Sequence, residues 1–375
     1  MESNTPPIPG TPPPFHIPPP VITAPPPTRV PRRWGWIIVS SILFVMLAFS
    51  VLMNIGSVFS GMGNVTSSHH GVGPRLDEVT VEDHSGSDKI AVIPIEGIIS
   101  SRMADRGGFN MVDIVKAQLK RADEDDDVKG VILRVDSPGG EVLASDDIAN
   151  LLREFQEDSG KPIVVSMGSL AASGGYYVAA PCEWIVANEL TITGSIGVIM
   201  HGYNYRGLMD KIGLKPDVYK SGKFKDMLSG DRLQSEVPPE ERAMVQKLID
   251  ETYAKFKSVV GEGRNAANDM NKDGRALVSD WASYADGRVF SGKEARELGF
   301  VDELGGFDTA VKRTLKLAKV KGEASIIEYR QRMDFADLFS IWGKSEAQVV
   351  KVDIGMDAPK LEAGRMYFIM STYLH

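Results

Sequence analysis

Apolar and polar residues alternate along the chain in blocks from residue 89 onward. Runs rich in valine and isoleucine, namely KIAVIPIEGII, GVILRV and PIVVSM, are typical of buried strands. The segments MVDIVKAQLKRADEDDD and EVLASDDIANLLREFQ carry apolar residues at helical spacing. Strands that alternate with helices need crossover connections, so the pattern predicts an α/β fold with a mostly parallel sheet covered by helices.

A different pattern follows Gly202. The segment YNYRGLMDKIGLKPDVYKSGKFKDMLSG has basic turns with aromatic residues between them. The next segment, PPEERAMVQKLIDETYAKFKSVVGEGR, begins with prolines and acidic residues, which is typical of a helix N-terminus, and continues with a long amphipathic pattern. The segment YADGRVFSGKEARELGFVDELGGFDTAVKRTLKLA predicts a strand, a helix, a short strand and a second helix.

The longest apolar run precedes all of these elements. No charged residue occurs from Trp36 to Met53, which is close to the minimum length for a helix that crosses a bilayer. Arginines precede the run, and few positive charges follow it directly, so the positive-inside rule places the N-terminus in the cytoplasm. We therefore predict a retained transmembrane anchor. A cleaved signal peptide is the alternative, but the run is long for one and starts far from Met1.

These patterns divide the chain into segments of different character. More than half of the 22 prolines lie in the first 31 residues, which favours an extended, disordered arm. Gly, Ser and charged residues follow the apolar run and predict a linker. The chain ends in a polar stretch and the short apolar segment RMYFIMSTYL. The predicted ranges are an arm over 1–33, a transmembrane anchor over 34–55, a linker over 56–88, a catalytic domain over 89–320 and a C-terminal extension over 321–375.

Composition narrows the classes of function. A net charge of −8 and a pI of about 5.4 argue against a general nucleic-acid surface. The single cysteine, Cys182, excludes an internal disulfide, and its apolar neighbours predict a buried thiol. Of the six histidines only His201 lies within the predicted core, and the adjacent pair His69 and His70 has no further ligands nearby. We therefore expect no metal and no cofactor.

The stretch MGSLAASGGYYVAA places Ser173 between a predicted strand and a predicted helix. The small residues around it form a relaxed nucleophile elbow, with alanine in the usual place of the first glycine. Backbone N–H groups at the start of the helix could hold an oxyanion, and the upstream turn at Gly139 and Gly140 offers a second set. The alternative is an ordinary N-cap serine, which the stretch alone favours.

A nucleophilic serine needs a base. His201 is the one plausible histidine for a Ser-His-Asp triad. A buried lysine is the other possibility, since burial lowers a lysine pKa from about 10.4 and makes a neutral amine available. The turn SGKFK supplies Lys223 and Lys225, with Lys220 just before it. Spacing does not say which of them points inward, and a solvated basic loop is the alternative for each.

The motifs PIEGII, VILRVDSPGG, SMGSLAASGGYYVAA, TGSIGVI, YKSGKFKD and GRVFSGKEARELGFVDELGG occur in this order over about residues 89–320. This series resembles the bacterial signal peptide peptidase A family, which are membrane-bound serine proteases of the Clp-protease and crotonase fold group. The resemblance implies repeated ββα units in the fold. It also implies the short, single-domain form of the family, which assembles as a dome-shaped octamer whose neighbouring subunits complete the active sites.

By position, the resemblance assigns a role to each candidate residue. The nucleophile falls on Ser173 and the general-base lysine on Lys225. The N–H group of Gly174 and one from the DSPGG turn correspond to the oxyanion hole, and we choose Gly140 for the second, with Gly139 as the alternative. Ser195 in TGSIG corresponds to a serine that orients the lysine. The implied activity is endopeptidase cleavage of remnant signal peptides, and of misfolded exported proteins, at the bacterial inner membrane with the catalytic domain outside the cytoplasm.

Two other functions remain open on the sequence. A crotonase-type acyl-CoA enzyme shares the fold group and the glycine N–H groups but needs no serine nucleophile. A catalytically inactive membrane scaffold that binds peptides is the second. The C-terminal segment RMYFIMSTYL is expected to pack on a neighbouring copy or to reach a substrate groove.

Overall fold

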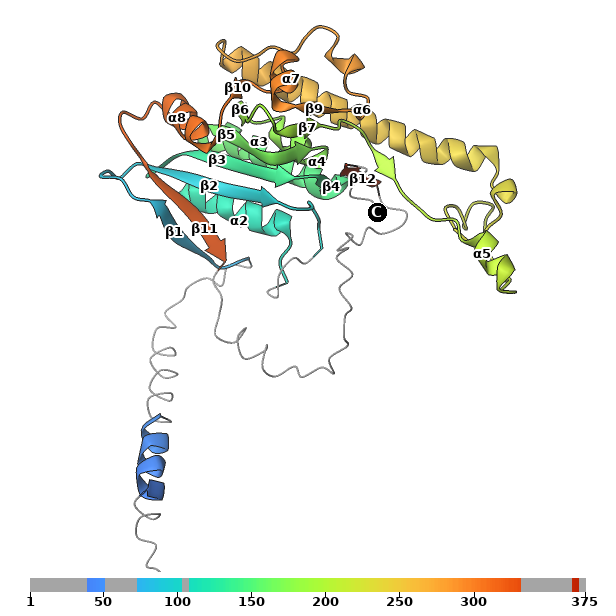
Figure 1. Cartoon of the computed structure of the whole chain (residues 1–375), viewed down its shortest axis with the longest axis horizontal. Coiled ribbons are helices and arrows are strands. Elements are labelled where there is room, and N and C mark those ends of the chain that lie inside the picture. The colour runs from blue at the N-terminus through green and yellow to red at the C-terminus, as the bar shows by residue number, and fades with distance from the viewer. Residues whose placement is uncertain (1–38, 51–72, 103–107, 332–365, 371–375) are drawn as a thin grey trace, which may run out of the picture. The chain divides into compact units, whose positions relative to one another are not determined.

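The computed structural model describes residues 39–50, 73–102, 108–331 and 366–370 (Figure 1). The chain divides into one unit of residues 1–71 and another of residues 72–375. In the first unit, residues 39–50 form a helix whose side chains are exposed. No helix among the described residues has both the length and the hydropathy that crossing a membrane requires. The proline-rich arm and both ends of the predicted anchor lie outside the described residues.

The second unit contains all the described strands. They are β1 (Leu76–Glu82), β2 (Lys89–Glu96), β3 (Val128–Ser137), β4 (Gly139–Glu141), β5 (Ile163–Ala172), β6 (Trp184–Ala187), β7 (Ile192–Gly194), β8 (Ile199–Met200), β9 (Val289–Ser291), β10 (Glu303–Leu304), β11 (Ser325–Gln331) and β12 (Met366–Ile369).

The helices of this unit alternate with the strands as the sequence predicts. They are α2 (Met111–Glu124), α3 (Val142–Ser159), α4 (Gly174–Ala179), α5 (Arg206–Lys211), α6 (Pro239–Met270), α7 (Gly292–Glu297) and α8 (Phe307–Leu317), with short 3₁₀ turns η1 (Gln234–Glu236) and η2 (Trp281–Ser283).

The main sheet has the strand order β1-β11-β2-β3-β5-β6-β10, and β7 joins it by pairing with β5 and β9. Every pair from β11 to β10 along this order is parallel, as is the pair of β5 with β7. Only β1 with β11 and β7 with β9 are antiparallel. The predicted α/β fold with a mostly parallel sheet is therefore confirmed.

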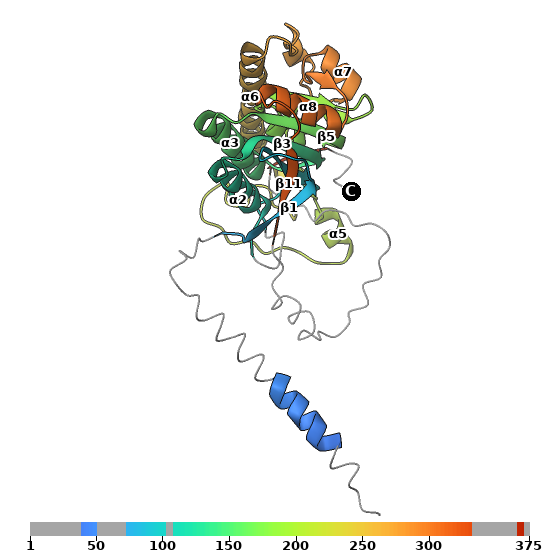
Figure 2. The same cartoon turned by 90° about the vertical axis from the view of Figure 1, so that its left-hand side faces the viewer.

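Helices cover both faces of this sheet (Figure 2). Alternate residues of β2 point to opposite sides, as a strand requires. Ile93 and Ile95 join a core with α2, α3, α4 and α6, whereas Ile90 and Val92 join a second core against α8. Burial on both faces explains why the central strands read as continuous apolar runs.

Two strands of the sheet lie in ranges that the sequence assigns elsewhere. β1 falls within the predicted linker 56–88, and β11 falls within the predicted extension 321–375. They pair with each other at the edge of the sheet, where most side chains of β1 are exposed. The segment LDEVTVE therefore carries charges that resemble those of a linker, although its backbone pairs with β11 along one edge.

A second, smaller sheet follows directly after β3. It has the order β4-β12-β8, and β12 is antiparallel to both neighbours. One residue, Pro138, separates β4 from the carboxyl end of β3, which is the edge where parallel α/β sheets bind ligands. The apolar C-terminal segment RMYFIMSTYL thus contains strand β12, which lies beside the DSPGG turn.

Candidate active site

Ser173 occupies a sharp turn between β5 and α4. Its backbone has φ 54° and ψ −117°, a conformation that residues with a side chain rarely adopt. Two hydrogen bonds hold this turn: the Ser173 N–H donates to the Gly194 carbonyl at 2.8 Å, and the Tyr177 N–H donates to the Ser173 carbonyl at 2.8 Å. A strained serine between a strand and a helix is the local geometry of a nucleophile elbow.

The Ser173 hydroxyl is buried and has no hydrogen-bond partner in the described part of the chain. Ser173 stands at the N-cap position of α4, but its side chain makes no capping bond, so the interpretation of this serine as a stabilising helix cap is wrong. A buried hydroxyl without a partner costs about 1–3 kcal/mol. A strained backbone and an unpaired hydroxyl at the same residue have no structural benefit here, which is typical of a group held ready for chemistry.

The two glycine turns pack backbone against backbone beside Ser173. Gly139 has φ 100°, and a methyl group added to it would lie 2.6 Å from the Gly174 nitrogen. A methyl group added to Gly174 would lie 3.0 Å from the Gly140 nitrogen. Only glycine permits so close an approach, so the structure brings the N–H groups of both turns to one place.

Backbone hydrogen bonds to Ile99 hold one edge of the turn at Gly139 and Gly140. The Ile99 N–H donates to the Gly139 carbonyl at 3.0 Å, and the Glu141 N–H donates to the Ile99 carbonyl at 2.8 Å. The Glu141 carboxylate accepts from the Ser101 N–H at 3.0 Å and from the Ser100 hydroxyl at 3.3 Å. The turn is therefore fixed along one edge and open for pairing along the other.

Ser195 lies beside the same site through its neighbour Gly194, whose carbonyl accepts the Ser173 N–H. Ser195 is buried, has φ 51°, and donates its N–H to the Arg288 carbonyl at 2.7 Å. The strain at Ser195 resembles that at Ser173. The two serines therefore sit on adjoining strained turns, at the ends of the paired strands β5 and β7.

The three lysines of the basic turn have different surroundings. Lys220 forms an ion pair with Asp226 at 2.7 Å, and Lys223 forms one with Glu240 at 3.5 Å. Lys225 is exposed and forms no ion pair with any residue that the structure describes. Of the three, Lys225 is the lysine whose ammonium group is available to another molecule.

The chain alone does not bring Lys225 to Ser173. Lys225 lies between α5 and α6, on a segment that extends beyond the edge of the sheet in Figure 1. His201 does not reach the serine either: its ring packs edge-on against Tyr203 at 4.8 Å between centroids, and its Nε2 atom has no described partner. Among the residues that the structure describes, no group therefore lies within hydrogen-bond reach of the Ser173 hydroxyl.

β12 lies along the open edge of the upstream glycine turn. Phe368 pairs with Gly140, Ile369 pairs with Gly139, and the Met370 N–H donates to the Pro138 carbonyl at 3.1 Å. The Phe368 carbonyl oxygen is 1.9 Å from the position of a methyl group on Gly139. The same oxygen is 3.0 Å from the position of a methyl group on Gly174. A strand from the chain's own C-terminal segment thus points a carbonyl at both glycine turns.

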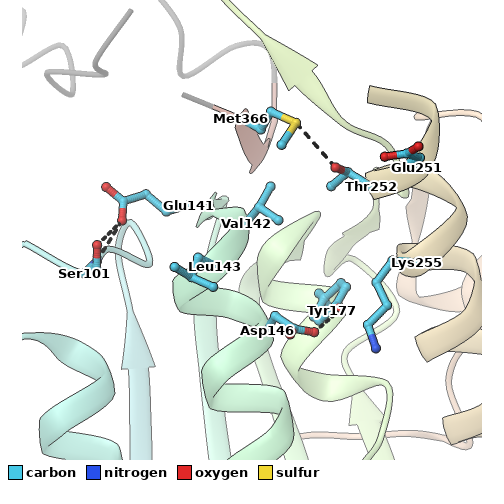
Figure 3. Close-up of a pocket in the computed structure, with 10 residues that line it drawn as sticks. All are labelled: Ser101, Glu141, Val142, Leu143, Asp146, Tyr177, Glu251, Thr252, Lys255 and Met366. Carbon is cyan, nitrogen blue, oxygen red and sulfur yellow. Dashed lines mark hydrogen bonds between the residues drawn. The ribbon is translucent and has the colours of Figure 1, made fainter. Parts of the chain in front are cut away.

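A cavity of about 730 Å³ lies between α3 and α6, next to β12 (Figure 3). We call this cavity and the adjoining groove that holds β12 the cleft. Its walls include Val142, Leu143 and Met366, and Tyr177 lies at its floor. The Tyr177 hydroxyl donates to Asp146 at 2.6 Å. Burial and this hydrogen bond raise the pKa of Tyr177, so the ring stays neutral.

Several features of the cleft were not visible in the sequence. Tyr177, Phe256 and Phe368 form an aromatic cluster from three distant segments, and no local pattern signals their meeting. The predicted burial of Cys182 is confirmed, and burial raises the pKa of its thiol to about 12. Among the described residues no group of three or more His, Cys, Asp or Glu side chains is placed to hold a metal ion.

Comparison with known proteins shows the family to which the chain belongs. Residues 155–321 match the model of peptidase family S49. The chain is 35% identical over 297 residues to a protein of Enterococcus faecium named "Putative signal peptide peptidase SppA", and the match covers 78% of each chain. The chain belongs to peptidase family S49. The S49 match contains Ser173, Ser195 and Lys225, whereas Gly140 lies upstream of it.

Two further proteins are similar to the chain at lower identity. The chain is 32% identical over 252 residues to Protease 4 of Haemophilus influenzae, with 66% of this chain and 38% of that protein covered. It is 32% identical over 229 residues to the chloroplastic serine protease SPPA of Arabidopsis thaliana, with 60% of this chain and 32% of that protein covered. The resemblance to the signal peptide peptidase A family is therefore confirmed, and the chain is a protease of the S49 family.

Proposed function

We propose that this chain is a membrane-anchored serine endopeptidase that uses Ser173 and Lys225 as a catalytic pair. The observation that carries the proposal is the Ser173 turn: a strained backbone, a buried hydroxyl without a described partner, and two glycine turns packed against it. The printed name of the Arabidopsis relative, a serine protease, supports the choice of a serine mechanism.

The proposed reaction passes through an acyl-enzyme. The neutral amine of Lys225 takes the proton of the Ser173 hydroxyl, and the serine oxygen attacks the carbonyl carbon of a peptide bond. The N–H groups of Gly140 and Gly174 stabilise the resulting oxyanion. The bond from carbon to nitrogen then breaks while Lys225 returns the proton to the leaving amine. Water hydrolyses the ester with the same lysine acting as base.

We assign the lysine to a neighbouring copy of the chain. Lys225 is exposed, and the segment that carries it also exposes large apolar side chains that a solvated loop does not need: Tyr203, Leu208, Ile212 and Tyr219 are 62–90% exposed. Contact between this segment and the cleft of a second copy would bury these side chains and complete the site. The octamer implied by the family resemblance has such contacts between neighbours.

The proposal includes a location and a substrate class. Residues 34–55 act as the single anchor, and the catalytic domain lies outside the cytoplasm of a bacterial inner membrane. Substrates are peptides bound in extended form, including remnants of signal peptides and misfolded exported proteins. The finer fold assignment, repeated ββα units of the Clp-protease and crotonase group, is supported by the parallel sheet and by glycine turns at its strand ends.

A serine-reactive fluorophosphonate probe tests the nucleophile directly. The full chain should be labelled, Ser173→Ala should abolish labelling, and Lys225→Ala should reduce it strongly because the serine loses its base. Lys223→Ala is the matched control, since Lys223 is paired with Glu240 and should leave labelling unchanged. Labelling that persists in Ser173→Ala would refute the assignment. A crotonase-type enzyme would show no serine labelling at all.

A further inference from the structure

The turn that carries Lys225 is held by polar groups and not by a hydrophobic core. In the described range 201–240 no residue is buried, so apolar packing does not fix the position of this turn. The Lys225 N–H donates to the Gly222 carbonyl at 3.4 Å, which is a long hydrogen bond. Leu228, near the end of the turn, has φ 67°, a region that leucine rarely adopts. A base must be held within a fraction of an ångström of its working position, so this turn needs another support.

Glu241 is the buried group that this turn contacts. It lies in the first turn of α6, and only 4% of the residue is exposed. Its Oε1 atom accepts from the Leu228 N–H at 3.3 Å, and its Oε2 atom accepts from the Arg232 guanidinium at 2.8 Å. One buried carboxylate therefore holds both the strained backbone of the turn and the guanidinium that follows it in the chain.

Arg232 connects this carboxylate to the residue beside the lysine. Its Nη1 atom donates to the Asp226 carbonyl at 3.2 Å and lies 3.5 Å from the Asp226 carboxylate, and its Nη2 atom donates to the Glu236 carbonyl at 2.8 Å. Asp226 directly follows Lys225, and its carboxylate accepts from the Lys220 ammonium at 2.7 Å. The residues on either side of Lys225 are thus tied through side chains to the beginning of α6.

We infer that Arg232 and Glu241 are positioning residues for Lys225, and that they hold its turn in the one conformation from which the amine reaches the serine of a neighbouring copy. A buried ion pair adds little net stability, because the loss of hydration offsets the attraction between the charges. In a segment without a core, such a pair instead selects a conformation. This inference rests on the proposed function, in which Lys225 is the base. It adds two residues that act through the turn and take no part in the proton transfer.

Steady-state kinetics of the full chain on a fluorogenic peptide test the role of the pair. Glu241→Gln keeps the size of the side chain but has one acceptor oxygen, which cannot serve both Leu228 and Arg232. It should lower kcat by about 10-fold to 100-fold, because a misplacement of about 1 Å can cost a factor of 100, and it should change KM little.

Two further variants separate this pair from its surroundings. Arg232→Met should have the same effect as Glu241→Gln, and the double variant should lose no more than the weaker of the two single variants, because each change breaks the same contact. Glu240→Gln is the matched control. Glu240 is the neighbour of Glu241 and pairs with Lys223 at 3.5 Å, but both side chains of that pair are more than 60% exposed, so kcat should stay unchanged.

Hydrogen exchange of the turn, followed by mass spectrometry, tests the pair without relying on catalysis. Exchange over residues 221–229 should be faster in Glu241→Gln than in the wild type or Glu240→Gln, while α3 should exchange alike in all three. An unchanged kcat in Glu241→Gln would overturn the inference, as would a lower kcat without faster exchange in the turn. A smaller assembly of Glu241→Gln in light scattering would also overturn it, because the pair would then serve assembly. If Lys225→Ala keeps normal turnover, the proposed function fails, and the exchange rates still decide whether the pair fixes the turn.

Discussion

Because β12 occupies the cleft, we predict that the C-terminal segment of the chain competes with substrate. Phe368 is fully buried, and its ring contacts Tyr177 and Phe256 while its backbone pairs with β4. A peptide that enters the cleft must first displace this strand. Phe368→Ala should therefore weaken the binding of β12 in the cleft and increase the activity of the enzyme on added peptide.

The size of the effect follows from the buried ring. Truncating a buried Phe to Ala costs about 3–5 kcal/mol, and about 1.4 kcal/mol corresponds to a factor of ten. The closed state, with β12 in the cleft, loses this energy, whereas the open state does not. The ratio of open to closed chains should rise by about 100-fold or more, and the apparent KM should fall by up to about the same factor. The kcat should change little, because the catalytic groups are untouched.

Initial rates on a fluorogenic peptide measure KM and kcat for the wild type and Phe368→Ala. Phe155→Ala is the control, since it removes a buried ring on α3 and should lower thermal stability without lowering KM. An unchanged or higher KM in Phe368→Ala, with a folded protein and normal kcat, would refute the reasoning that the tail blocks the cleft.

Three further predictions concern the turn, the core and the thiol. Gly139→Ala should lower kcat/KM by about 100-fold or more, measured beside the thermal midpoint, because the methyl group would lie 1.9 Å from the place of the Phe368 carbonyl and Gly139 has φ 100°. Arg264→Leu should cost about 3–5 kcal/mol in urea unfolding, because it leaves the buried Asp302 carboxylate without its ion pair; a loss below 1 kcal/mol would contradict this. The pKa of Cys182 is raised by burial to about 12 from an ordinary 9.0, so the unfolded thiol ionises first and its contribution to stability is lost as pH rises from 9 toward 12. The thermal midpoint should therefore fall less steeply above pH 9 in Cys182→Ala than in the wild type, and equal slopes would count against it.

The parallel core could be predicted because its strands are buried on both faces. GVILRV and PIVVSM are apolar at nearly every position, and the helices between them have clear spacing. The pair β1 and β11 could not, because the exposed edge strand β1 tolerates charges and its pairing partner β11 lies more than 240 residues away in the chain. Local propensity carries no information on such a pairing.

The candidate active site also has features that could be predicted from the sequence and features that could not. The turn at Ser173 and the turn at Gly140 follow buried parallel strands, so their meeting at one edge of the sheet follows from topology. The strain at Ser173 and its unpaired hydroxyl, which exclude a stabilising helix cap, are visible only in the folded chain. The aromatic cluster and β12 depend on contacts among α4, α6 and the C-terminal segment, which no local pattern encodes. The pairing of Ser173 with Lys225 stays a prediction, since it requires a second copy.

Mixing two inactive variants tests this pairing most directly. Ser173→Ala and Lys225→Ala should each be inactive on peptide when purified alone. Unfolded together in equal amounts and refolded, they should regain activity at about a quarter of the sites, because one copy then supplies the serine and its neighbour supplies the lysine. A mixture as inactive as its parts would contradict the account, as would normal turnover by Lys225→Ala alone.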